Sequence, residues 1–232
     1  MVADLLVAET STLTIEAGAT VQLGAGVGIE VRGALVARGT KERPIRFTLL
    51  DGAAGSGDGQ PGEPVTWGSL TFADSARDAV LDDEGGYLSG SILEHCLFEQ
   101  GSRAVWLLGA SPAIIDSSFL ANRIGVTPEL KCGAALFVGP GSAPLIRGNK
   151  FADNEAGGFC QGGAVFVDLG QPILQDNRFL RNASAYGGAL ATNGLYSPIV
   201  GNLFESNRVL TKGGALSLIS SSPAFLDNTV RA

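Results

Sequence analysis

The sequence has little of what most catalytic and metal sites are built from. It contains a single histidine, His95, and three cysteines in 232 residues. One histidine excludes sites that need several, and no CxxC pair or neighbouring histidine accompanies the cysteines as zinc ligands would require. We therefore expect neither a metal ion nor a cofactor.

Long apolar runs and basic clusters are also missing. No apolar run approaches the ~20 residues of a membrane helix, so we expect no membrane insertion. The 16 basic and 23 acidic residues give a net charge of −7, which argues against nucleic acid and anionic membranes as partners. The start, MVADLLVAETS, lacks the regions of a signal peptide, and DNTVRA ends the chain in mid-repeat. We expect a piece of a longer protein.

What the sequence has instead is a repeat anchored on phenylalanine. The anchor recurs at intervals of 21 to 32 residues. An aliphatic or aromatic residue stands five positions before it, Ser or Asn two before it and Asn three after it. A small residue, usually preceded by glycine, opens each unit. The anchors are Phe98, Phe119, Phe151, Phe179 and Phe204, with Val230 in the last copy.

Each unit contains three short apolar runs separated by Gly, Pro or Asn, and none has the length or spacing of a helix. Residues 11–49 show shorter units of the same kind. This pattern predicts an all-β fold, a right-handed parallel β-helix of roughly eight coils, as a single domain over residues 1–232. Polar stretches rich in Gly and Pro predict loop excursions at 51–66, 73–90 and 123–131.

Stacking of coils about 4.8 Å apart places like residues over like. Phenylalanines and aliphatic residues then fill the interior. Asparagine at a corner can adopt the left-handed conformation and hydrogen-bond the same amide one coil above and below. We interpret both asparagine columns as structural; they are Asn149, Asn177, Asn202 and Asn228, and Asn122, Asn154, Asn182 and Asn207.

Two groups of residues resemble known repeats. The segment IEAGATVQLGAGVGIEVRGALVARGTKERPIRF, followed by WGSLTF, resembles the opening of many bacterial right-handed parallel β-helix repeat proteins. Gly162-Gly163-Ala164, with Phe179 to Asn182, is similar to the GGA and FxxN elements of chlamydial polymorphic outer membrane proteins. Such proteins are typically secreted or surface-exposed and include adhesin passengers, polysaccharide lyases and glycoside hydrolases. The resemblance implies a secreted or cell-surface location, but it does not choose an activity.

Candidate catalytic residues are few. His95 is interpreted as a structural residue within a strand, whose neighbours Glu94 and Cys96 point to the opposite face. Glycosidases need two carboxyls about 5 to 9 Å apart, and the best local candidate is Asp82-Asp83-Glu84, for which a solvated loop is the alternative. We assign no catalytic residue. Whether the protein is an enzyme stays open, and a non-catalytic role is favoured.

The cysteines leave one alternative open. Cys132 and Cys160 each lie a few residues before the alanine that opens a coil, on neighbouring coils. A disulfide between them is therefore within reach, although two free thiols would fit the pattern as well. Cys96 falls in the Ser/Asn column and is interpreted as a small buried residue.

A candidate binding face comes from the strand that opens each coil. Its first and third positions are aliphatic and should point inward, so the residue between them points outward. This outward position is aromatic in three successive coils, as Trp106, Phe137 and Phe166. An exposed aromatic stripe usually marks a contact. The alternatives are that a loop, 51–66 or 123–131, covers the stripe, that two copies pair through it, or that the register is wrong.

The sequence thus supports a non-catalytic, adhesin-like β-helix module of a secreted or cell-surface bacterial protein that binds a polysaccharide or protein ligand. A polysaccharide lyase or glycoside hydrolase acting at the N-terminal half is the alternative, and a rigid structural spacer is another. Nothing in the sequence indicates the oligomeric state.

Overall fold

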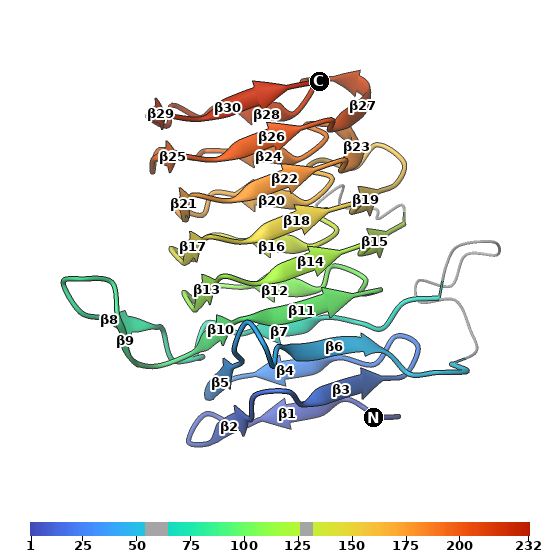
Figure 1. Cartoon of the computed structure of the whole chain (residues 1–232), viewed down its shortest axis with the longest axis vertical. Coiled ribbons are helices and arrows are strands. Elements are labelled where there is room, and N and C mark those ends of the chain that lie inside the picture. The colour runs from blue at the N-terminus through green and yellow to red at the C-terminus, as the bar shows by residue number, and fades with distance from the viewer. Residues whose placement is uncertain (54–64, 126–131) are drawn as a thin grey trace.

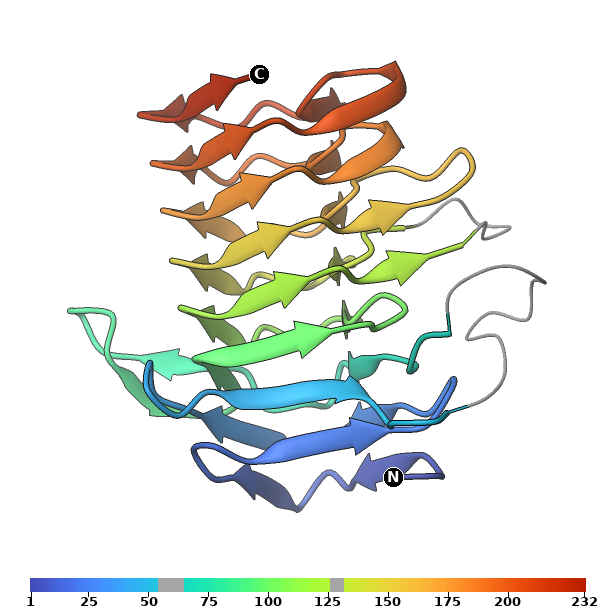
Figure 2. The ribbon, with the colours of Figure 1, turned by 45° about the vertical axis from the view of Figure 1, so that its right-hand side comes forward.

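The computed structural model describes residues 1–53, 65–125 and 132–232, which form a stack of coils with the two chain ends at opposite ends of the long axis (Figure 1). Three parallel sheets of eight strands run the length of the stack. Sheets A, B and C each take one strand from every coil, and this confirms the predicted all-β parallel β-helix and its eight coils. Figure 2 shows the same stack from a second direction.

The strands are short. Sheet A contains β1 (Leu5–Val7), β4 (Ile29–Val31), β7 (Leu70–Phe72), β12 (Val105–Leu107), β16 (Leu136–Val138), β20 (Val165–Asp168), β24 (Leu190–Asn193) and β28 (Leu216–Ile219). Sheet B contains β2 (Thr12–Ile15), β5 (Ala34–Arg38), β10 (Ile92–Glu94), β13 (Ala113–Ile115), β17 (Leu145–Arg147), β21 (Ile173–Gln175), β25 (Ile199–Val200) and β29 (Phe225–Leu226). Sheet C contains β3 (Thr20–Leu23), β6 (Ile45–Leu49), β11 (Cys96–Glu99), β14 (Ser118–Leu120), β18 (Lys150–Ala152), β22 (Arg178–Leu180), β26 (Leu203–Glu205) and β30 (Thr229–Arg231).

A fourth, smaller sheet, sheet D, was not expected. It begins in the fourth coil and consists of β15 (Arg123–Ile124), β19 (Glu155–Ala156), β23 (Ala183–Tyr186) and β27 (Arg208–Lys212). The excursion predicted at 123–131 therefore begins too early, because its first two residues are a strand. Residues 126–131 lie outside the described part of the chain.

The interior is organised by a phenylalanine ladder, which consists of Phe47, Phe98, Phe119, Phe151, Phe179 and Phe204. All six side chains are fully buried. Successive ring centroids are 4.7 to 4.9 Å apart and the rings lie within 12° of parallel. That distance is the spacing of neighbouring strands, so the coil repeat itself imposes the ring stacking. Val230 pairs with Phe204 in the last coil, as predicted.

The asparagine columns are hydrogen-bonded ladders at two corners, as predicted. In the ladder between sheets B and C, Asn177 Nδ2 donates to the carbonyl of Ile146 in the preceding coil (2.8 Å) and to Asn202 Oδ1 in the following one (3.0 Å). Its own Oδ1 accepts from the backbone N and Nδ2 of Asn149 (2.9 and 3.0 Å). The second ladder follows sheet C and repeats this pattern, for example from Asn154 to Asn182.

The left-handed conformation occurs at a different position from the predicted one. It is adopted by the residue before each ladder residue, such as Asp116 (φ 47°) and Asp176 (φ 55°), and not by asparagine itself. This residue turns the chain so that the next side chain points into the corner. His95 occupies the same place (φ 47°), so it lies between β10 and β11 rather than within a strand, which corrects the prediction.

The GGA element has a steric explanation. Gly162 is left-handed (φ 68°). A Cβ on Gly163 would lie 2.1 Å from the carbonyl oxygen of Gly188 in the next coil, closer than any side chain can approach. The second glycine is therefore required because two backbones meet there.

The excursion predicted at 73–90 is not a free loop. It contains the antiparallel hairpin β8 (Val80–Leu81) and β9 (Tyr87–Ser89), which projects from the side of the stack (Figure 1). Its base packs Ala79, Leu81 and Tyr87 on an apolar stripe of the outer face of sheet B, which consists of Val36, Ile92, Ala113, Ile115 and Leu145. Most of the other predicted excursion, 51–66, lies outside the described residues.

Candidate functional site

The outward column of sheet A has the register that the sequence predicts. Trp106 pairs with Phe137, and Phe137 pairs with Phe166, on successive strands. The flanking residues of these strands point into the main core, whereas the three aromatic residues and Ala191 form a separate cluster. The prediction that the three aromatic side chains point outward is therefore confirmed.

The aromatic stripe is nevertheless not an open surface. Phe137 and Phe166 are only 2% and 3% exposed, while Trp106 is half-buried. The rings also do not form a flat platform, because Trp106 meets Phe137 edge-on at 87° and Phe137 is tilted by 58° from Phe166. The expectation that Phe137 and Phe166 form an exposed contact face is wrong. A binding role for Trp106 stays a prediction.

Arg103, which the sequence did not single out, covers part of the stripe. Its guanidinium carbon lies 4.2 Å from the centroid of the Trp106 ring and 5.8 Å from that of Phe137. The cation thus stabilises the aromatic pair from one side. Because Arg103 is itself 8% exposed, it closes this side of the stripe to ligands.

The accessible edge of Trp106 lies beside a cleft on the outer face of sheet A. The cleft has a volume of about 370 Å³, and its lining includes Asp4, Glu30, Ser69 and Thr71. Thr71 is the neighbour of Trp106 in the preceding coil, and Glu30 is the next in the same outward column. The cleft therefore continues the stripe toward the N-terminal coils, where the aromatic residues give way to hydroxyl and carboxylate side chains.

The floor of this cleft is backbone. A Cβ on Gly28 would lie 2.7 Å from the carbonyl oxygen of Ser69, and one on Gly68 would lie 2.7 Å from that of Gly26. Glycine at these positions lets the coils approach each other.

The polar groups around the cleft differ in how far they are engaged. Asp4 Oδ1 accepts a hydrogen bond from Gly28 N (2.8 Å), and Glu30 pairs with Arg32 at 2.6 Å while staying 42% exposed. The indole Nε1 of Trp106 is buried and donates to no described residue. A buried donor without an acceptor costs about 1 to 3 kcal/mol.

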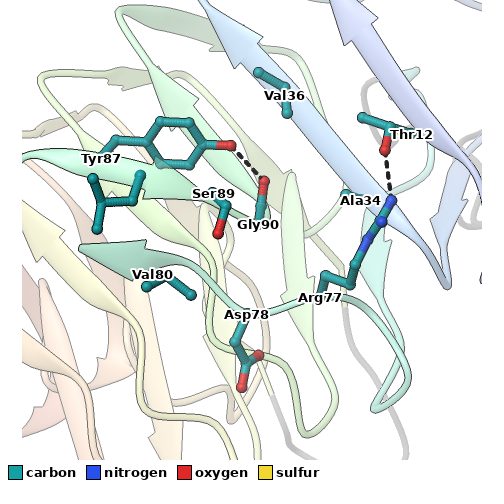
Figure 3. A pocket seen from close by; sticks show the side chains of 10 residues that line it. Thr12, Ala34, Val36, Arg77, Asp78, Val80, Tyr87, Ser89 and Gly90 are labelled. Atoms are coloured by element: carbon teal, nitrogen blue, oxygen red, sulfur yellow. Dashed lines mark hydrogen bonds between the residues drawn. The ribbon is translucent and has the colours of Figure 1, made fainter. Parts of the chain in front are cut away.

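A second cleft of about 600 Å³ lies between the hairpin and sheet B (Figure 3). Its polar side chains hold the hairpin in place. Arg77 Nη2 donates to the Ser11 carbonyl (2.7 Å) and to Thr12 Oγ1 (2.5 Å), and Tyr87 Oη donates to the Gly90 carbonyl (2.8 Å). These groups are engaged, as Asp4, Glu30 and Ser69 are in the cleft beside Trp106, but the second cleft has no tryptophan among its lining residues.

The acidic run Asp82-Asp83-Glu84 is at the hairpin tip. Asp82 Oδ1 accepts from the backbone N of Glu84 (3.0 Å) and of Gly86 (2.7 Å), so it holds the turn. Arg147 of sheet B reaches the tip but donates to the Gly85 carbonyl, at 3.4 Å. The run forms no ion pair with a described residue. One oxygen of the Asp82 carboxylate is therefore committed to holding the turn.

An acid and an arginine do meet on the outer face of sheet C. Arg46 and Glu99 pair at 2.5 Å in a groove of about 470 Å³ that Asp51 also lines. The sequence analysis did not connect these residues, because the predicted excursion at 51–66 separates the strands that carry them. The short ion pair occupies the Glu99 carboxylate, so the groove holds no free pair of carboxylates.

A disulfide joins Cys132, which follows β15, to Cys160, which follows β19, and so fastens the fourth coil to the fifth. Their Cα atoms are 5.4 Å apart, and both side chains are fully buried beside Ile124, Ala134 and Ala156. Of the two alternatives, a disulfide and two free thiols, the structure has the disulfide. Cys96 is the free cysteine, and burial raises the pKa of its thiol to about 12.

Thiol labelling checks this arrangement. In the folded protein at pH 8 a thiol reagent should modify no cysteine, because Cys96 is 2% exposed and stays protonated. In denaturant without reductant one thiol should react, and after reduction all three cysteines should react. Mass spectrometry counts the labels. Three labels in denaturant before reduction would contradict the disulfide.

The described part of the chain also offers no metal site, since none of its His, Cys, Asp and Glu side chains gather in groups of three. Among the same residues there is no helix with the length and hydropathy needed to span a bilayer. The expectation of no cofactor stays a prediction.

Residues 60–232 match the sequence profile of a family described as the right handed beta helix region. No curated protein and no solved structure matches the chain significantly. The likeness to chlamydial outer membrane proteins is not shown.

Proposed function

We propose that this chain, which belongs to the right-handed β-helix family, is a glycan-binding module whose ligand occupies the cleft beside Trp106. The fold of the family serves many activities, so the function has to be inferred from the residues of the site itself. The observation that carries this proposal is the half-buried indole at the end of a cleft lined with hydroxyl and carboxylate groups.

A sugar ring presents two kinds of surface, and the cleft has a counterpart for each. The apolar C–H face of a sugar packs on an aromatic ring, and Trp106 is the aromatic residue that lines the cleft. Sugar hydroxyls donate to carboxylates and exchange hydrogen bonds with hydroxyls, which Glu30, Ser69 and Thr71 supply.

A protein ligand is less well matched to this cleft. Protein interfaces are anchored by several apolar and aromatic residues at a desolvated centre. Here Phe137 and Phe166 are already covered, which leaves the edge of a single aromatic residue. The glycan is therefore the ligand that the accessible groups favour.

Catalysis is the less supported alternative. Asp82 holds a turn, and Glu99 is paired with Arg46, so neither offers a free carboxylate as acid or base. The disulfide favours an oxidising compartment, and this supports a secreted or cell-surface location for the module.

The test is binding to a panel of neutral and acidic polysaccharides by calorimetry. Trp106→Ala should weaken binding of the recognised glycan by roughly tenfold or more, about 1.4 kcal/mol or more, because it removes the aromatic anchor. Tyr196→Ala is the matched control, since Tyr196 is an aromatic residue that is 64% exposed outside the cleft, and its loss should leave affinity unchanged.

Fluorescence reports on the same event. The second tryptophan, Trp67, is fully buried and donates to the Glu99 carbonyl at 2.7 Å, so ligand should change the emission of Trp106 alone. If no polysaccharide binds, or if Trp106→Ala binds as well as the native protein, the proposal fails. New reducing ends or unsaturated products would favour the lyase or glycosidase instead.

A further inference from the structure

Outward charges on this solenoid follow a rule of opposite partners. Where a cation faces a charged residue one coil away, that residue is an acid. The pairs that join neighbouring coils are Arg38–Glu94 (2.7 Å), Arg46–Glu99 (2.5 Å), Arg181–Asp153 (2.7 Å), Arg231–Glu205 (3.2 Å) and Arg123–Glu155. Opposite charges across neighbouring strands stabilise a sheet, and like charges directly opposite destabilise it.

Lys150 and Arg178 break this rule. They stand directly opposite each other on β18 and β22 of sheet C, and both are exposed. Neither forms an ion pair with a described residue. Two cations one strand spacing apart repel each other, and on a chain with a net charge of −7 acids are not scarce. The sheet therefore carries an uncompensated positive site at this point.

The acids closest to this pair in sequence are engaged elsewhere. Asp153 accepts two hydrogen bonds from Arg181, from Nε at 2.8 Å and from Nη2 at 2.7 Å. Asp176 places Oδ1 only 2.3 Å from where a Cβ on Gly201 would lie, so its carboxylate covers the corner of the next coil. Neither carboxylate is placed to neutralise the Lys150–Arg178 pair.

We propose that Lys150 and Arg178 form a binding site on the outer face of sheet C for a carboxylate or sulfate group of an acidic polysaccharide. An oxyanion between the two side chains accepts hydrogen bonds from both. The planar guanidinium of Arg178 can bind two of its oxygens, while the ammonium of Lys150 contributes a point charge. This site is independent of the Trp106 cleft, which lies on sheet A.

The surroundings decide which kind of anion fits. Ala152 and Leu180, which follow the pair on the same strands, are only 1% and 8% exposed, so the site has no exposed apolar anchor of the kind a protein interface needs. Ser118, opposite Lys150 on the other side, adds a hydroxyl. Two cations are too few for nucleic acid, whose affinity rises with the number of neutralised phosphates. A polar chain with widely spaced anionic groups matches both features.

The experiment compares a carboxylated polysaccharide with its methyl-esterified neutral form at low ionic strength. Lys150→Ala and Arg178→Ala should each weaken binding of the carboxylated form by roughly tenfold. Arg231→Ala is the matched control, because it removes the same charge from the same sheet at a residue already paired with Glu205. Its affinity should stay within about twofold, and affinity of the native protein should fall with added salt.

Folding and the other site are controlled separately. Thermal unfolding at low salt should show that Lys150→Ala is as stable as the native protein or more so, since a repulsion has been removed. Inorganic sulfate should raise the melting temperature of the native protein more than that of Lys150→Ala at equal ionic strength. Trp106→Ala should keep the preference of the native protein for the carboxylated over the neutral form, so failure of the Trp106 proposal and failure of this one are distinguishable.

Equal binding of the carboxylated and neutral polymers would overturn the proposal, as would an equal loss in Arg231→Ala. Binding of poly-glutamate but of no acidic polysaccharide would overturn the assignment to a glycan.

Discussion

Replacing Asn177 by alanine is expected to lower the free energy of unfolding by about 3 kcal/mol or more, although the side chain points into the corner and belongs to neither proposed site. Asn177 is fully buried, and its amide makes four hydrogen bonds that join three successive coils. Alanine removes all four. It leaves the Ile146 carbonyl and the backbone N of Asn149 buried without these partners, at about 1 to 3 kcal/mol each.

Asn228→Ala is the control for this prediction. It deletes the same side chain from the same ladder in the last coil, where the residue is only half-buried and water can replace the lost partners. Urea unfolding followed by circular dichroism should show a loss at least twice as large for Asn177→Ala. Equal losses of unfolding free energy in the two variants would show that burial does not determine how much each asparagine stabilises the fold.

Phe151→Ala is expected to cost about 3 to 5 kcal/mol, the usual range for a large buried aromatic residue. Its ring lies 4.8 Å from that of Phe119 and 4.9 Å from that of Phe179, and none of it is exposed. The cavity left by alanine cannot close, because both neighbouring rings are held at the strand spacing by their own coils.

Phe159→Ala is the matched control for this deletion. Phe159 is 67% exposed, so the same change there should cost no more than about 0.5 kcal/mol. Thermal unfolding of the two variants makes the comparison. A small loss in Phe151→Ala would mean that the stack relaxes around the gap, against the rigid packing described for the phenylalanine ladder.

The fold was predictable because the residues that form its core recur in every repeat unit. Phe151 and Asn177 recur at fixed positions relative to each other, and a stack of coils turns such a recurrence into contact between like residues. The same reasoning gave the register of sheet A correctly. It missed the left-handed corner, because the residue there is aspartate in some coils, glycine in others and His95 in one, so that only the conformation repeats.

The candidate site was less predictable, because alternation gives the direction of a side chain but not what covers it. Trp106, Phe137 and Phe166 all point outward, yet Arg103 and the packing of the rings against one another remove most of the stripe from solvent. Arg103 lies before the strand, outside any repeated column. The cleft beside Trp106 depends on Glu30 and Ser69, from coils in which the repeat has other residues and spacings.

The hairpin shows a similar limit. Its apolar residues Leu81 and Tyr87 are few and separated by the acidic run, so the segment has the composition of a solvated loop. Only the outward apolar stripe on sheet B, which belongs to other coils, gives these residues something to pack on. Contacts between an excursion and a distant coil leave no periodic signal in the sequence.

The direction of the hydrogen bonds between strands has a mechanical consequence. The strands lie across the long axis and pair with the coil above and below, so a tension applied between the two ends of the stack loads these bonds one coil after another (Figure 2). Coils would peel from an end in sequence. The Cys132–Cys160 bond ties the fourth and fifth coils covalently, so between these cysteines the peeled chain could extend no further. The disulfide thus limits how far the chain lengthens under load.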